Sequence, residues 1–314
     1  MMNIHVIGVG KMGLPMACHF MAAGYVVSVS DADPQRLALA AAKGLTVVAD
    51  AKTMATADII FSSLPHDAAL LAVAAKVAAS ARQGATFVDT STVSQQASRD
   101  AAALLLGTGI AYLRTTVSGN NHMAEAALLT VMASGPRASY DVVLPAPKLL
   151  GPHQFYLGAG EEARLMKLVV NLMIAQTSAM LSEGLALGRK GGLDWQDMWQ
   201  VLCASAVASP ILKAKAVQLA KRDFTPTFTV EQMVKDLTLI LAAGQAVHAP
   251  LPQTAMTLQL MQAAMAQGDA LDDYAAIIKT VERSAGLSTQ FDPALPVRHP
   301  GLDPGSMDCG SSPQ

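Results

Sequence analysis

The stretch that decides the fold reads Ile4-His5-Val6-Ile7-Gly8-Val9-Gly10-Lys11-Met12-Gly13-Leu14-Pro15-Met16-Ala17. Its apolar start predicts a strand, its glycines predict a turn, and its last residues predict a helix. The glycines fit G-x-G-x-x-G: Gly8 allows a tight turn, Gly10 lets a pyrophosphate approach the backbone, and Gly13 lets the helix pack closely on the strand. Because glycines also serve ordinary turns, the triplet alone leaves both interpretations open.

The next predicted strand favours a cofactor loop. It runs from Tyr25 to Ser30 and ends at Asp31, eighteen positions after Gly13, where a dinucleotide-binding fold places the acid that binds the adenosine ribose. A carboxylate there repels a 2′-phosphate, and no arginine follows before Arg36, so NAD is favoured over NADP. The alternative role for Asp31 is to cap the helix after Pro34. The predicted cofactor contacts in this region are Gly8, Val9, Gly10, Lys11, Met12, Gly13 and Asp31.

The composition describes a weakly charged chain with a large core. The sequence is 52% hydrophobic and 15% charged with a formal net charge of −2, which does not indicate a nucleic-acid surface. Cys18, Cys203 and Cys309 lie far apart without C-x-x-C spacing, so we expect no disulfide framework, no metal site and a reducing cytoplasm. Polar residues interrupt the longest apolar run, Leu165 to Leu181, which predicts a buried helix and no membrane span.

Strand-like segments alternate with alanine-rich helical segments through the first half of the chain. Further strands are predicted at 46–48, 58–63, 86–88, 111–113 and 129–133. This alternation predicts a Rossmann-type α/β domain, with a mainly parallel sheet, helices on both faces and ligands beyond the carboxyl ends of the strands. The segments Leu64-Pro65-His66 and Asp89-Thr90-Ser91-Thr92 follow strands at that edge, although each also fits a turn or a helix cap.

From about Glu161 the pattern predicts helices only. The first runs to about Arg189 and is apolar nearly all round, so we expect it at the centre of an all-helical domain or between subunits. Further helices are predicted at 194–204, 209–220, 230–247, 253–267 and 275–283, with Trp195 and Trp199 packing together. The predicted domains are an NAD-binding domain at 1–160, an all-helical substrate and dimerisation domain at 161–289 that the long central helix joins to the first, and a disordered Pro/Gly/Ser-rich tail at 290–314.

Polar residues form one narrow stripe on the long helix. At about 100° per residue, this stripe contains Arg164, Lys167, Asn171, Ser178 and Ser182. Desolvating an ammonium is costly, so a lysine in such a helix needs a reason. Two interpretations stay open at this point: Lys167 contacts a ligand, or its ammonium reaches water.

These motifs resemble those of the β-hydroxyacid dehydrogenase family, which includes 3-hydroxyisobutyrate dehydrogenases and tartronate semialdehyde reductases. The opening stretch matches the family signature G-x-G-x-M-G-x-P-M-A at every fixed position. Leu64-Pro65 and Asp89-x-Ser91-Thr92 match two cleft loops of the family. Lys167 with Asn171 matches K-x-x-x-N, and Lys235-Asp236-Leu237 matches K-D-L. The resemblance covers all but the tail and implies that Leu64, Pro65, Thr92 and Lys235 contact the cofactor.

A second family signature is only partly kept. Relatives read D-A-P-V-S-G-G where this chain reads Arg114-Thr115-Thr116-Val117-Ser118-Gly119-Asn120. The resemblance implies that Ser118 and Gly119 hold a substrate carboxylate. Asn120 either contacts the substrate, with Asn121 and His122 beside it, or takes the left-handed backbone conformation of the missing glycine. The first alternative favours a more polar or longer substrate. Ala127 stands where relatives usually have a later glycine.

The resemblance implies an NAD(P)-dependent 3-hydroxyacid dehydrogenase that transfers a hydride between NAD(H) and a small hydroxy acid or semialdehyde. Lys167 would then exchange the hydroxyl proton as general acid and base, and Asn171 would orient the lysine or the substrate. A cytoplasmic homodimer or homotetramer is expected, with no nucleic-acid or membrane partner.

Three alternative functions stay open. The first is an imine reductase, against which Lys167 argues. The second is a sugar-acid dehydrogenase of the phosphogluconate kind, in which Arg114 could bind substrate. The third is a non-catalytic nucleotide-binding module, against which the retention of Lys167, Asn171 and Lys235 argues.

Overall fold

The computed structural model describes residues 2–48 and 51–290, so the predicted tail lies outside the described residues except for Gln290. The chain divides into two compact units, Met1–Val170 and Asn171–Gln314. The division falls inside a helix of 29 residues, α7 (Glu162–Lys190), which is the long joining helix expected from the sequence. The predicted domain boundaries at 160/161 and 289/290 stay predictions.

The first unit contains an eight-stranded sheet of order β3-β2-β1-β4-β5-β6-β7-β8. Its strands are β1 (Asn3–Ile7), β2 (Val26–Ser30), β3 (Thr46–Val47), β4 (Ile59–Ser62), β5 (Thr86–Asp89), β6 (Ala111–Ser118), β7 (Thr130–Ser134) and β8 (His153–Gly158). Neighbouring strands from β3 to β6 pair in parallel, β7 is antiparallel to β6, and β8 is parallel to β7. The predicted Rossmann-type sheet is confirmed. No strand is predicted from the sequence at β8, although Phe155, Tyr156 and Leu157 form a short apolar run there; in the structure it is an edge strand along which exposed and half-buried residues alternate.

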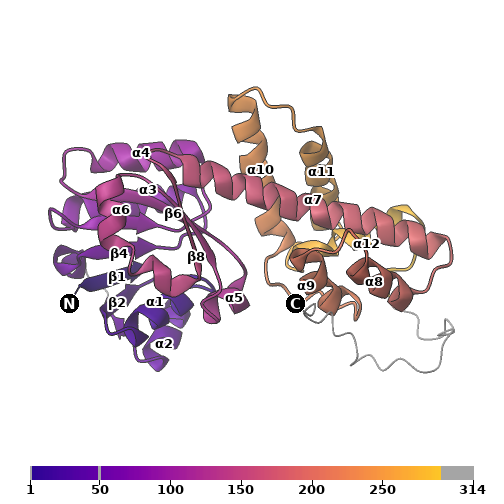
Figure 1. Cartoon of the computed structure of the whole chain (residues 1–314), viewed down its shortest axis with the longest axis horizontal. Helices are drawn as coiled ribbons and strands as arrows, with labels where there is room; N and C mark the ends of the chain where they lie inside the picture. Colours follow the sequence, from indigo (N-terminus) through magenta and orange to yellow (C-terminus); the bar gives the residue numbers. More distant parts are fainter. Residues whose placement is uncertain (1, 49–50, 291–314) are drawn as a thin grey trace. The chain divides into compact units, whose positions relative to one another are not determined.

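Side chains alternate across this sheet and build a core on each of its faces. Val6 and Phe61 pack on the face covered by α1, α2 and α6, whereas Ile60 and Phe87 pack on the face covered by α3 and α4. Figure 1 shows α1 and α2 on one side of the strands and α3 and α4 on the other. The helices and 3-10 turns of this unit are α1 (Gly13–Ala22), α2 (Pro34–Ala42), η1 (Ala51–Thr56), α3 (Asp67–Ser80), α4 (Gln95–Leu105), α5 (Asn121–Glu125), α6 (Arg137–Val143) and η2 (Pro147–Leu150).

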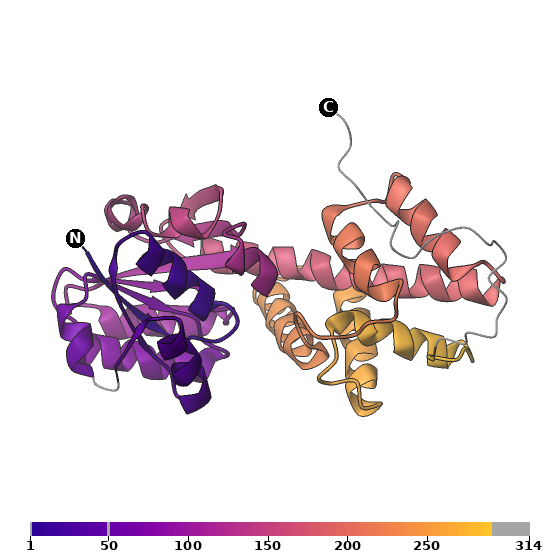
Figure 2. The ribbon, with the colours of Figure 1, turned by 90° about the horizontal axis from the view of Figure 1, so that it is seen from below.

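The second unit is helical, and Figure 2 shows its helices gathered along the part of α7 that belongs to this unit. They are α8 (Trp195–Ala204), α9 (Pro210–Leu219), α10 (Val230–Ala246), α11 (Pro252–Ala266), η3 (Tyr274–Ala276) and α12 (Ile277–Ser284). The five α-helices begin and end within two residues of the predicted ranges, and η3 lies at the start of the last range. The rings of Trp195 and Trp199 pack edge to face with centroids 5.7 Å apart, which confirms their packing role.

α7 is less buried than its apolar sequence predicts. The side chains of Met173, Met180 and Leu187 are 65%, 55% and 76% exposed, so the expectation of a fully buried helix is wrong within this chain. By length and composition α7 is also a helix that could cross a membrane. However, Asn171 and Ser182 of its polar stripe are buried among protein side chains, as in the core helix of a folded domain.

His5 is a buried titratable group at the centre of the sheet. Its ring nitrogens lie 2.9 Å from Ser28 Oγ and 3.0 Å from Ser30 Oγ, both on β2. Burial lowers the pKa of His5 from 6.5 to about 4. In the unfolded chain the imidazole titrates near its ordinary pKa. Between pH 6.5 and about pH 4 the unfolded state therefore binds a proton that the folded state does not bind.

We predict that the free energy of unfolding contains a contribution from His5 that is fully present above pH 6.5 and is lost as the pH falls to about 4. The loss should be about 3 kcal/mol, from 1.36 kcal/mol for each unit of pKa difference. Urea unfolding of the wild type and of His5→Gln across this pH range measures it. The stability difference between the two proteins should shrink toward pH 4. The matched change His153→Gln, on an exposed strand end, should give a pH-independent difference; equal slopes for both variants would contradict the assignment.

Candidate active site

The turn between β1 and α1 has no room for a side chain at two of its three glycines. A Cβ atom at Gly8, whose φ is +88°, would lie 2.3 Å from the carbonyl oxygen of Ser63. A Cβ atom at Gly13 would lie 1.9 Å from the carbonyl oxygen of Gly8. At Gly10 the nearest protein atom would be Arg36 Nη1 at 3.3 Å, so the fold alone demands glycine less strictly there. A ligand that approaches the backbone at Gly10 would account for that glycine.

The start of α1 is suited to an anion. Its N-cap residue, Met12, makes no side-chain capping bond, and the first turn contains no acidic residue. The first N–H groups of a helix need acceptors from outside the helix and carry the positive end of its dipole. A pyrophosphate at this turn, beside Val9 and Lys11, would supply those acceptors.

Asp31 lies directly after β2 and joins the same turn. Its Oδ2 accepts the N–H of Val9 at 2.8 Å, and its Oδ1 accepts the N–H of Asp33 at 2.9 Å. The cap of α2 is Asp33, which accepts the N–H of Gln35, so the capping alternative for Asp31 is wrong. Arg36 Nη1 lies 3.8 Å from Asp31 Oδ2. The sequence places no arginine between Asp31 and Arg36, but the first turn of α2 brings Arg36 itself close to the carboxylate. The inference that no arginine lies near Asp31 is therefore wrong.

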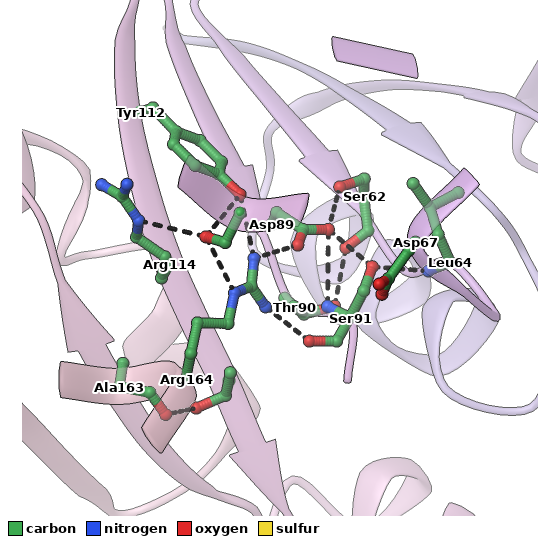
Figure 3. Close-up of polar contacts among 12 residues, drawn as sticks. Ser62, Leu64, Asp67, Asp89, Thr90, Ser91, Tyr112, Arg114, Ala163 and Arg164 are labelled. Atoms are coloured by element: carbon green, nitrogen blue, oxygen red, sulfur yellow. Dashed lines mark hydrogen bonds and ion pairs between the residues drawn. The ribbon is translucent and has the colours of Figure 1, made fainter. Parts of the chain in front are cut away.

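The two cleft loops after β4 and β5 are bonded to each other. Ser91 Oγ donates to Asp89 Oδ1 at 2.6 Å and accepts the N–H of Leu64 at 2.8 Å. Figure 3 shows this chain of contacts, which holds the loop of Leu64 and Pro65 beside the loop that ends at Thr92. The N-cap of α4 is Ser94, whose Oγ accepts the N–H of Ala97 at 3.0 Å, so Ser91 and Thr92 do not cap this helix. His66 is exposed and caps α3 by accepting the N–H of Ala69.

Ser118 and Gly119 lie at the end of β6, where the retained part of the second signature begins. Gly119 has φ +136°, and a Cβ atom there would lie 2.6 Å from Leu129 Cδ2, so glycine is required. Asn120 has φ −97° and caps α5 through an Oδ1 that accepts the N–H of Met123 at 3.0 Å. The left-handed alternative for Asn120 is therefore wrong.

The residues that follow extend this polar loop. Asn121 Oδ1 is buried and has no hydrogen-bond partner among the described residues. His122 is exposed, with its Nδ1 3.9 Å from Glu125 Oε2. An orphaned buried acceptor next to the predicted carboxylate loop is a place for a donor from a ligand.

Arg114 belongs to the interior of the first unit. Its side chain is 8% exposed, forms an ion pair with Glu161, and lies over the ring of Tyr112 at 4.4 Å. Its Nε donates to Ser98 Oγ at 3.3 Å. A substrate role for Arg114, on which the sugar-acid alternative depended, is therefore not supported by its placement.

Lys167 and Asn171 lie one turn apart on α7, and Lys167 is half-buried. Asn171 is buried and donates its amide N–H to Asp236 Oδ2 at 2.5 Å. Lys235 Nζ lies 3.0 Å from Asp236 Oδ1. Asp236 thus holds the amide of Asn171. The K-D-L motif contains this acid, but the motif alone does not predict its contact with Asn171. The predictions that Lys235 contacts the cofactor and that Asn171 orients Lys167 or the substrate stay predictions.

Both halves of the chain match the sequence patterns of known protein families. Residues 3–158 match the NAD binding domain of 6-phosphogluconate dehydrogenase, and residues 158–281 match the NAD-binding domain of NADP-dependent 3-hydroxyisobutyrate dehydrogenase. The 2-(hydroxymethyl)glutarate dehydrogenase of Eubacterium barkeri is 32% identical over 91% of this chain and 97% of its own length. The human cytokine-like nuclear factor N-PAC is 27% identical over 88% of this chain, which spans 51% of that protein.

A solved structure is similar throughout. The 3-hydroxyisobutyrate dehydrogenase of Mycobacterium tuberculosis, determined with L-serine, superposes with a TM-score of 0.82 at 28% identity. The match covers 90% of this chain and 99% of that one.

The backbone at Ala127, which follows α5 in the predicted substrate loop, has a positive φ. Its φ is +54°, a conformation that costs a residue with a Cβ atom about 1–2 kcal/mol and glycine almost nothing. We predict that Ala127→Gly stabilises the protein by about 0.5–1 kcal/mol, because relief of strain exceeds the added entropy of the unfolded chain. The neighbouring change Ala126→Gly, at φ −86°, should destabilise by a similar amount. Urea unfolding of both variants checks the prediction, which would be wrong if both changes had the same sign.

Proposed function

The chain belongs to the β-hydroxyacid dehydrogenase family, a family of NAD(P)-dependent oxidoreductases, and we propose that it transfers a hydride between NAD(H) and a small, polar 3-hydroxy acid or its semialdehyde. The observation that carries this proposal is Lys167, half-buried on the polar stripe of α7 one turn before Asn171. The K-x-x-x-N motif of the family contains a lysine at this position, whereas the packing of an apolar helix gives no reason for one.

The residues at the first turn fit a dinucleotide. The uncapped start of α1, the crowded glycines and the carboxylate of Asp31 form a cradle for a pyrophosphate and a ribose. Gly8 to Gly13 would hold the pyrophosphate, and Leu64, Pro65 and Thr92 would line the nicotinamide half. The bound nicotinamide supplies the hydride acceptor or donor.

Lys167 would handle the proton. In oxidation its neutral amine accepts the proton of the substrate hydroxyl as the hydride leaves the same carbon. In reduction its ammonium returns that proton to the developing alkoxide. Asn171, itself held by Asp236, would orient the amine or the substrate. Ser118 Oγ and the N–H of Gly119 would bind the substrate carboxylate.

The substrate loop supports a polar substrate. The buried Asn121 Oδ1 needs a donor, and an unpaired buried acceptor costs about 1–3 kcal/mol. Asn120 adds an amide beside it, although its oxygen is engaged by α5. A hydroxy acid with a second polar group suits this loop better than 3-hydroxyisobutyrate does. The names of two relatives agree: one acts on a hydroxymethyl-substituted dicarboxylate, and the other was determined with L-serine.

The alternative functions have less support. An imine reductase would not need Lys167 to carry a hydroxyl proton. A non-catalytic module, suggested by the similarity to N-PAC, does not account for Lys167, Asn171 and Asp236 being retained together on α7 and α10.

We also propose that the protein is a cytoplasmic homodimer or homotetramer. The exposed apolar side chains of Met173, Met180 and Leu187 recur along one face of α7, as expected of a surface that a second copy covers. The mass of the purified protein, measured by light scattering, decides between monomer and oligomer.

We predict that Lys167→Ala folds, binds NADH and loses turnover. General acid–base catalysis contributes about 10²–10⁴-fold, so kcat should fall by that factor on the best substrate among a panel of 3-hydroxy acids. The control Lys190→Ala removes an exposed lysine from the other end of the same helix and should keep wild-type kcat. Steady-state kinetics at the nicotinamide absorbance band measure both. Near-normal kcat in Lys167→Ala would refute the assignment.

We predict a lower KM for NADH than for NADPH, because the carboxylate of Asp31 repels a 2′-phosphate. The nearby Arg36 should limit the preference by attracting that phosphate. Asp31→Ser should therefore narrow the ratio of the two KM values, and Arg36→Ala should widen it. Steady-state kinetics with both coenzymes test this series; a wild type that prefers NADPH would reverse the proposal.

A further inference from the structure

Asp89, the last residue of β5, is a fully buried carboxylate with many partners. Its Oδ1 accepts hydrogen bonds from the hydroxyls of Ser62 and Ser91, at 2.5 and 2.6 Å. Its Oδ2 forms an ion pair with Arg164 (Figure 3). One carboxylate therefore connects the end of β4, the loop after β5 and the first turn of α7.

Arg164 uses its guanidinium to reach several groups at once. Besides Asp89, it donates to the carbonyl oxygen of Ser91, to the hydroxyl of Tyr112 at 3.0 Å and to Ser98 Oγ at 3.3 Å. The side chain is 1% exposed. Burial by itself would lower the pKa of Arg164, but its interactions with Tyr112 and Asp89 outweigh burial and raise the pKa. Arg164 is therefore a permanent cation inside the first unit.

Further contacts fix the start of α7 to the sheet. Arg114 of β6 pairs with Glu161, directly before the helix. Thr116 Oγ1 of β6 donates to the carbonyl oxygen of Ala163 at 2.9 Å. Ser134 Oγ of β7 donates to the carbonyl oxygen of Gly160 at 2.8 Å. All of these contacts lie within the first unit, and Lys167 follows Arg164 by three residues on the same polar stripe.

We propose that Asp89 and Arg164 are a positioning pair, which sets the first turns of α7, and with them Lys167, against the loop from Ser91 to Thr92. The proposal rests on the proposed function, in which Thr92 lines the nicotinamide half of the cofactor and Lys167 carries the proton. Ser91 extends the pair to the other cleft loop, because its hydroxyl bonds both Asp89 and Leu64. A reacting group that is misplaced by about 1 Å can cost about 10²-fold in rate.

Asp89→Asn tests the pair, with Glu282→Gln as its matched control. Glu282 is also fully buried, and it forms ion pairs with Arg189 and Arg222 in the second unit. Both changes replace a buried carboxylate by an amide of the same shape, so both should lower the melting temperature. Only Asp89→Asn should lower kcat, by about 10–100-fold. The Kd for NADH should stay within about 3-fold of wild type, because the first turn and Asp31 are untouched.

The double variant Asp89→Asn/Arg164→Met removes both charges and serves if Asp89→Asn alone does not fold. Its kcat should be no lower than that of Asp89→Asn, because the two residues act as one unit. A kcat for Asp89→Asn within about 2-fold of wild type, or a kcat for the double variant clearly below that of Asp89→Asn, would overturn the proposal.

Hydrogen exchange provides a test that needs no substrate. Backbone amides at 89–94 and at 162–170 should exchange faster in Asp89→Asn than in the wild type, and those in Glu282→Gln should not. Unchanged exchange in both segments would overturn the pair whether or not the enzyme turns over. A wild type that oxidises no 3-hydroxy acid would instead refute the proposed function and leave the exchange result to decide the pair.

Discussion

The close approach of α1 to the end of β1 is the constraint on which the rest of the first unit depends. A helix can begin there only if Gly13 lies directly against the carbonyl of Gly8 and if Gly8 itself adopts a positive φ beside Ser63. The backbone N–H of Gly8 bonds Ser30 at the end of β2, and the N–H of Ser63 bonds Ile7. The turn is thus anchored to both neighbours of β1, where the strand order reverses direction. In open α/β sheets this is the place where ligands bind.

Local patterns were sufficient to predict most elements, because their signals lie within a few residues. The glycine turn, the strands that end at Ser30 and Asp89, and the helices of the second unit all carry such signals. The partners of buried polar groups could not be predicted in this way. Asp89 meets Arg164 and Asn171 meets Asp236 across more than sixty positions of sequence. The contact between Arg36 and Asp31 could not be predicted either, because the two residues are separated in sequence and only the first turn of α2 brings Arg36 next to the carboxylate.

The departures from the second signature fall into two physical groups. Arg114 and Thr116 point into the unit, where they bond Glu161 and the backbone of Ala163. These two departures therefore affect how β6 is bonded to the start of α7. Their placement does not link them to the substrate. Asn120, Asn121 and Ala127 instead lie on the loop around α5. Differences in substrate choice between this protein and its relatives should be sought on that loop.

The pairing of Asp89 with Arg164 also constrains the order in which the protein can be assembled. The strand that ends at Asp89 is made early, whereas the cation that neutralises it arrives seventy-five residues later, inside a helix that continues into the second unit. During synthesis the carboxylate of Asp89 therefore has no cationic partner until the first turns of α7 have been made. A fragment cut at residue 160 would contain a buried carboxylate without its arginine, a defect of about 3–5 kcal/mol. A stable isolated nucleotide-binding unit therefore has to include the beginning of the helix that follows it.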